Sequence, residues 1–171
     1  MAEEIKNMVE KVPAEMRWTI ATRALTGMIT AMDAATQAAL GPEKHKEMVT
    51  QLWGAAGPGV KQLVDALGLP ADDAKAAANA VTTATVVMLG PEVQVEVIEA
   101  TPTKVLGRVT GCPWPLRTKE MGAALDCVPP CGAYFEAAYK AVNPKLVFRP
   151  GDKCMMRGDP YCGDWVLELP T

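Results

Sequence analysis

The sequence has one histidine, no cysteine before residue 112, no surplus of basic residues and no long uncharged apolar run. Its 17 Lys and Arg residues are interspersed with acids at a net charge of −3, so it lacks a basic surface for a phosphate backbone, and we expect no nucleic-acid partner. No stretch approaches the roughly 18 uncharged apolar residues that a membrane span needs. We therefore expect no membrane partner and a cytoplasmic location.

The single histidine restricts the catalytic chemistry. His45 lies in the polar run 43–47, where we expect a solvated side chain and no Cys-His dyad. Proton transfer then falls to carboxylates near the cysteines, namely Glu120, Asp126, Asp159 or Asp164. Asp159 follows a glycine and is typical of a turn. We favour Glu120, because it is close in sequence to Cys112.

The first 90 residues are predicted to be mainly helical. Their apolar residues recur at spacings of three and four in stretches that end at glycines. These stretches are Pro13–Leu40, a second from Glu43 to the glycines at 54–59, Val60–Leu67, and an Ala-rich segment from Pro70 to Leu89. The first is expected to be amphipathic, with an apolar face formed by Met16, Ile20, Leu25, Met28 and Met32. The glycines at 54–59 are not a phosphate loop, since no Gly-Lys-Ser/Thr follows them.

Residues 91–171 are predicted to be richer in strands. Val93, Val95 and Val97 alternate with polar residues, as in a strand with one face on a core. Further strands are expected at 104–110, 145–148, 153–156 and 165–169, with short helices at about 117–126 and 133–142. With 49% hydrophobic residues in 171, a single domain with one core is expected. We predict an α+β fold in which the helical N-terminal half packs on a C-terminal antiparallel sheet with a cysteine-bearing closing hairpin.

The five cysteines fall in the last third of the chain, at positions 112, 127, 131, 154 and 162. In a reducing compartment such thiols are metal ligands, reactive thiols or small buried side chains more often than disulfides. A hairpin symmetric about Gly158 would place Cys154 opposite Cys162, although a slip of one residue would separate them. Cys127 and Cys131 flank two prolines that break the chain and turn both sulfurs toward one point.

Together these two pairs form a candidate metal site. Cys127, Cys131, Cys154 and Cys162 would make a tetrahedral four-thiolate set suited to Zn²⁺, and an iron–sulfur cluster is the less favoured cofactor. Cys112 follows a strand and either replaces one ligand or stays a free thiol.

The order of these parts resembles the L-2-amino-thiazoline-4-carboxylic acid hydrolase family and, more distantly, the 4-vinyl reductase domain. The shared features over about the last 80 residues are Cys112-Pro113, Glu120 with Gly122, Cys127 with Cys131, Asn143-Pro144, and Gly158-Asp159-x-x-Cys162 before an aromatic strand. Trp165 lies three residues after Cys162, where the family pattern leads us to expect two.

The resemblance implies a small-molecule hydrolase that opens a thiazoline ring at a cyclic amidine C–N bond. Such a reaction needs an activated water or a thiolate and a proton donor, which we assign to Cys112 and Glu120. A closed four-thiolate zinc site has no open position for water, so the alternative is a non-catalytic small-ligand-binding or metal-sensing module. The expected partner is a small molecule, and a homodimer stays open.

Overall fold

A helical half precedes a sheet in the computed structural model, which describes residues 8–123 and 125–170. After a short 3₁₀ turn, η1 (Val9–Lys11), come α1 (Ala14–Leu40), α2 (Pro42–Ala56), α3 (Gly59–Ala66) and α4 (Ala74–Leu89). These agree with the helices expected from the sequence, except that α2 continues through Gly54, where a break was predicted. Within the described residues, no helix is both long and apolar enough to cross a membrane.

The strands form one antiparallel sheet in the order β1-β2-β4-β3. Their bounds are β1 (Gln94–Ala100), β2 (Lys104–Gly111), β3 (Val147–Arg149) and β4 (Cys162–Glu168). Between β2 and β3 lie α5 (Pro113–Met121) and α6 (Val128–Val142), and η2 (Met155–Arg157) precedes β4. The predicted α+β class is therefore confirmed, and the last strand carries Cys162.

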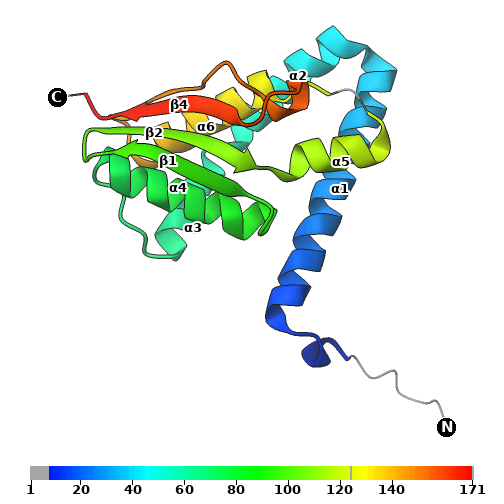
Figure 1. Cartoon of the computed structure of the whole chain (residues 1–171), viewed down its shortest axis with the longest axis horizontal. Helices are drawn as coiled ribbons and strands as arrows, with labels where there is room; N and C mark the ends of the chain where they lie inside the picture. Colours follow the sequence, from blue (N-terminus) through cyan, green and yellow to red (C-terminus); the bar gives the residue numbers. More distant parts are fainter. Residues whose placement is uncertain (1–7, 124, 171) are drawn as a thin grey trace.

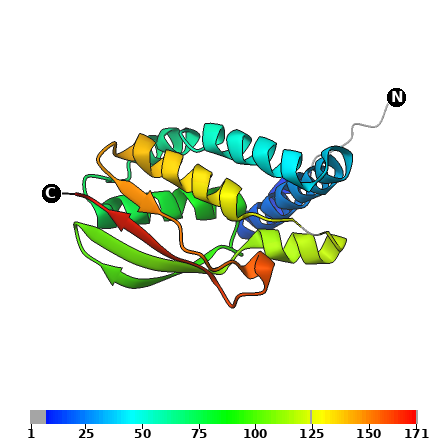
Figure 2. The same cartoon turned by 90° about the horizontal axis from the view of Figure 1, so that it is seen from above.

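Helices cover one face of the sheet in two layers (Figure 1). Helices α4 and α6 lie against the strands, and α2 packs on the outer side of α6 (Figure 2). The core includes Val81 of α4, Val105 of β2 and Leu167 of β4, each at most 1% exposed. Helices α1 and α5 and the turn η2 gather at one end of the sheet (Figure 2). That end holds the candidate site.

A bulge in β4 accounts for the unusual position of Trp165. Gly107 pairs with Trp165 while the next residue, Arg108, pairs with Gly163, so Asp164 is an extra residue in β4. Asp164 has a positive φ of 42°, as bulge residues often do. Because the bulge adds one residue to β4, Trp165 points into the core even though it lies three residues after Cys162. Its ring lies over Gly107.

Two helices begin earlier than predicted. Helix α5 spans Pro113–Met121 instead of 117–126, and α6 begins at Val128 instead of 133. Proline lacks the N–H that a first helical turn leaves unpaired, so prolines fit there without breaking the helix. The Pro-Pro pair after Cys127 is thus the first turn of α6.

The predicted closing hairpin is only partly present. Residues 153–156 were expected as a strand, but 155–157 form the 3₁₀ turn η2, and one isolated bridge joins Lys153 to Gly163. That bridge is centred on Gly158, which is the register predicted to place Cys154 opposite Cys162. The turn forms because the Cys154 N–H donates to Asp159 Oδ2 at 2.8 Å, which draws the loop inward. The expected turn role of Asp159 is confirmed.

Helix α1 buries its polar face, whereas its apolar pattern predicts that the apolar face is buried. Its apolar stripe is exposed, with Met16, Ile20, Leu25, Met28 and Met32 at 53, 58, 42, 58 and 63%. Its buried residues are Thr22, Thr26 and Thr30, whose hydroxyls donate to carbonyls of the preceding turn. Since each hydroxyl is satisfied within its own helix, burial costs little, and α1 presents a polar ridge to the rest of the protein.

Candidate functional site

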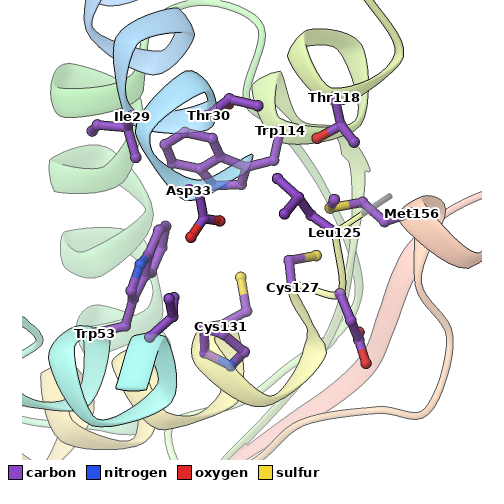
Figure 3. Close-up of a pocket in the computed structure, with 13 residues that line it drawn as sticks. Ile29, Thr30, Asp33, Trp53, Trp114, Thr118, Leu125, Cys127, Cys131 and Met156 are labelled. Carbon is purple, nitrogen blue, oxygen red and sulfur yellow. The ribbon is translucent and has the colours of Figure 1, made fainter. Parts of the chain in front are cut away.

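A small cavity lies where α1, α2, α5, η2 and the start of α6 meet (Figure 3). Its volume is about 30 Å³, which is room for a few water molecules. The lining is mainly apolar, and the acidic and thiol side chains in it are Asp33, Asp126, Cys127 and Cys131. An apolar cavity with a few convergent polar groups is the usual form of a small-molecule site.

A broader hollow of about 660 Å³ adjoins this cavity on the outer side. Thr118, Leu125, Asp126 and Met156 line both spaces, so these residues form the wall between them. Lys46 and Lys119 supply positive charge to the outer hollow. The unbranched side chain of Met156 is the most adaptable part of this wall.

His45 and Asp33 form a buried pair that connects the two spaces. His45 Nε2 lies 2.6 Å from Asp33 Oδ1, and the histidine is 5% exposed. The expectation of a solvated His45 is therefore wrong, because α2 turns the ring toward α1. Asp33 lines the inner cavity and His45 the outer hollow. In Figure 3 the Asp33 carboxylate points into the cavity toward Cys131.

Aromatic rings form one wall of the cavity. The rings of Trp53 and Trp114 meet edge to face with centroids 5.4 Å apart, and Trp53 meets Tyr134 in the same way at 5.8 Å. Both tryptophans line the same cavity as Asp33 (Figure 3). Such rings offer flat apolar walls and electron-rich faces to a ligand.

The thiols of Cys127 and Cys131 both point into the cavity (Figure 3). Interaction between these two sulfurs raises the pKa of Cys127 and lowers the pKa of Cys131, and interaction with Cys127 lowers the pKa of Cys154 as well. The physical cause is that one thiol donates its proton toward the other sulfur, which favours a thiolate at the acceptor.

Cys154 and Cys162 lie behind this pair, outside the lining of either space. The sulfurs of Cys127 and Cys154 are 3.6 Å apart, and Cys154 is hydrogen-bonded in turn to Cys162. The Met155 N–H donates to the Cys162 sulfur at 3.2 Å. The four predicted metal ligands are thus brought together as a chain of contacts. However, no group of three or more His, Cys, Asp or Glu in residues 8–123 and 125–170 is arranged to hold a metal ion.

Cys112 precedes α5 and lines neither the cavity nor the outer hollow. Burial, together with the nearby Cys131 sulfur, raises the pKa of Cys112 to about 12. Its thiol is therefore protonated at neutral pH and is a weak nucleophile in this state. The catalytic assignment of Cys112 stays a prediction, and the arrangement favours Cys131.

Glu120 is held by two arginines away from the cavity. It pairs with Arg23 at 2.9 Å and with Arg117 at 2.8 Å, and its side chain is 50% exposed. Arg117 is buried and also pairs with Glu92. The hydrogen bonds from Arg117 lower the pKa of Glu120, so its carboxyl is ionised at neutral pH. The arrangement favours a structural role, and proton donation by Glu120 stays a prediction.

Sequence reasoning missed Asp33 and Trp53, because they lie about 75 to 100 residues before Cys127 and Cys131, which line the same cavity. One signal was present. Asp33 is the only acidic residue between Glu15 and Glu43, in a helix otherwise rich in alanine, threonine and methionine. An isolated carboxylate in such a helix indicates a specific contact.

Comparison with known proteins identifies relatives of the whole chain. The family model described as L-2-amino-thiazoline-4-carboxylic acid hydrolase matches residues 18–165. Among solved structures, the phenol-responsive sensory domain of the transcription activator PoxR, crystallised with phenol, has a similar fold with a TM-score of 0.57. The two chains are 14% identical over 85% of this chain and 74% of the sensory domain. No curated protein matches the chain.

Proposed function

Because the chain belongs to the L-2-amino-thiazoline-4-carboxylic acid hydrolase family, we propose that its cavity is the site of hydrolytic opening of a small cyclic amidine. One observation carries this proposal. Two thiols and a carboxylate line the same small, mainly apolar space. A hydrolase needs a nucleophile, a proton donor and a place shielded from bulk water, and this space supplies all three.

Cys131 and Cys127 have complementary roles in the proposed reaction. The Cys131 thiolate adds to the ring carbon between sulfur and the nitrogens, the bond from that carbon to the ring nitrogen breaks, and Cys127 protonates the nitrogen. Water then adds to the same carbon, Cys127 recovers its proton from that water, and Cys131 leaves as the thiolate. The net change is the addition of one water. Neighbouring groups with pKa values shifted in opposite directions suit this division into nucleophile and acid.

The proposal is tested by incubating purified protein with aminothiazoline carboxylate and searching for a product heavier by one water. We expect turnover by the wild type and a loss on the order of a thousandfold in kcat for Cys131→Ser, with no more than a few-fold change for Cys112→Ser. Thermal melts check that each variant is folded. Absence of turnover by folded wild-type protein rejects the proposal, while loss with Cys112→Ser alone returns the nucleophile to Cys112.

A second candidate, a ligand-binding module with a structural zinc ion, is favoured by the contact between Cys127 and Cys154. Zinc–sulfur bonds of about 2.3 Å in a tetrahedron place sulfurs about 3.8 Å apart. The observed separation of 3.6 Å is close to that edge. Cys131 and Cys162 would be the other two ligands of the set. Similarity to a phenol-binding sensory domain agrees with a binding role.

Metal analysis separates the two candidates. The zinc module predicts about one zinc per chain and a lower melting temperature in chelator, because a structural ion couples binding to folding. The hydrolase with a free Cys131 predicts metal-free protein with turnover unaffected by chelator. Metal-free protein whose melting does not respond to chelator would reject the zinc module.

A further inference from the structure

We infer that Asp33, held by His45 and in one cavity with Trp53 and Trp114, is a recognition site for a flat cation of the amidinium type. The inference rests on the proposed function for its choice of ligand, but its evidence is the geometry of the cavity wall opposite the thiols.

The Asp33 carboxylate pairs with His45 through one oxygen and lines the cavity. Its Oδ1 accepts from His45 Nε2 at 2.6 Å, and no Lys or Arg among the described residues forms a salt bridge with it. The side chain is 25% exposed, lines the cavity, and points toward its centre (Figure 3). Oδ2 is therefore the oxygen that remains for a ligand.

The surroundings of Asp33 select for a flat cation. Trp53 and Trp114, in edge-to-face contact with each other, line the cavity together with the carboxylate, and aromatic rings attract cations and pack against planar groups. An amidinium carries parallel N–H donors on a delocalised positive charge, which matches a carboxylate as a guanidinium does. A neutral or anionic ring would gain less, because it offers no positive charge to the carboxylate.

Asp33 and the thiols lie on opposite walls of one small cavity (Figure 3). Because the cavity of about 30 Å³ holds only water, the amidinium enters by displacing side chains of the wall shared with the outer hollow. Held at Asp33, it then presents its central carbon to the Cys131 sulfur, so the group that binds the cation also orients the carbon that reacts. Asp33 is the binding residue in this arrangement. His45 is a positioning residue that fixes the carboxylate and touches no ligand.

The test is a calorimetric binding measurement with two small probes that differ in charge. One is 2-amino-2-thiazoline, a cyclic amidine that is cationic at neutral pH, and the other is 2-methyl-2-thiazoline, a neutral ring of similar size. We expect wild-type protein to bind the amidine more tightly than the neutral ring. Asp33→Asn, which keeps the shape and removes the charge, should weaken amidine binding about 10- to 100-fold and leave the neutral ring unaffected.

Three further variants sharpen the test. His45→Gln should weaken amidine binding by a smaller factor, and Trp53→Leu should weaken it while leaving the carboxylate in place, which keeps the test valid if Asp33→Asn does not fold. Asp65→Asn, in an exposed pair with Lys61, is the matched control and should change nothing. Equal affinity for both probes, no binding of either by folded wild-type protein, or full amidine binding by Asp33→Asn would overturn the inference. Selective binding without turnover would reject the hydrolase and keep the recognition site.

Discussion

Two carboxylates, Glu120 and Asp33, show opposite relations between sequence and site. Glu120 lies close in sequence to Cys112, yet it is half exposed and neutralised by Arg23 and Arg117. Asp33 lies far from every cysteine in sequence, yet it lines the cavity that Cys127 and Cys131 share. A carboxylate already held by two arginines has little affinity left for a ligand. One that faces an apolar cavity beside a single histidine is still available.

The largest expected effect in this comparison is on kcat/KM. Asp33→Asn should lower kcat/KM for aminothiazoline carboxylate about 100-fold, mainly through KM, because it removes a charge that binds the substrate. Glu120→Gln should change kcat/KM less than about threefold, because the side chain is outside both spaces. Steady-state kinetics on folded variants measures both. The reverse order of effects would restore Glu120 as the proton donor and break the comparison.

The helical and strand composition follows closely from sequence patterns, but the site does not. Helix α4 behaves as its pattern predicts, because Ala77, Val81 and Ala84 are buried on one face. Helix α1 departs from its pattern. The spacing of apolar residues shows that a helix has an apolar and a polar face, but it does not show which face packs against the protein. Its threonines satisfy their own hydroxyls and can be buried, so the polar face, with Asp33, packs inward.

The sequence predicts that the cysteines cluster, but it does not predict which sulfurs lie in contact. Their order and the centre of the last loop at Gly158 were read correctly, since the Lys153–Gly163 bridge has that register. The sulfur nearest to Cys154 is that of Cys127, at 3.6 Å, and its position depends on where α6 begins. The sequence pattern predicts a chain break at the two prolines, but they form the first turn of α6. In the sequence, the only sign of the bulge at Asp164 is the three-residue spacing between Cys162 and Trp165.

The next effect is on stability, in the cluster around Glu120. Arg117→Ala should lower the free energy of unfolding by about 3 kcal/mol, because a buried guanidinium that joins Glu92 and Glu120 is lost and the two carboxylates repel each other. Denaturant titration measures the loss. Turnover of the remaining folded enzyme should be nearly unchanged. A specific loss of turnover at full stability would show that this cluster belongs to the site.

A smaller effect is the pH dependence of stability carried by Glu120. Arg117 lowers the pKa of Glu120 in the folded state, so the ionised carboxyl stabilises the fold above the ordinary pKa of a glutamate, about 4.3. That contribution is lost as the pH falls through the depressed folded value. Glu120→Gln should therefore melt below the wild type at pH 7, and the difference should shrink below about pH 4. A difference that does not vary with pH would contradict an ionised Glu120.

The smallest expected effect is at Met32, directly beside Asp33 in the sequence. Its side chain is 63% exposed, on the outward stripe of α1, while Asp33 faces the cavity. Met32→Ala should change the free energy of unfolding by less than about 0.5 kcal/mol and leave kcat/KM unaltered, because little surface is removed from a packed environment. Denaturant titration beside Asp33→Asn tests whether two neighbouring residues have separate roles. A loss of about 2 kcal/mol or more at Met32 would mean that the apolar stripe is covered in solution, and the inward assignment of Asp33 would then need revision.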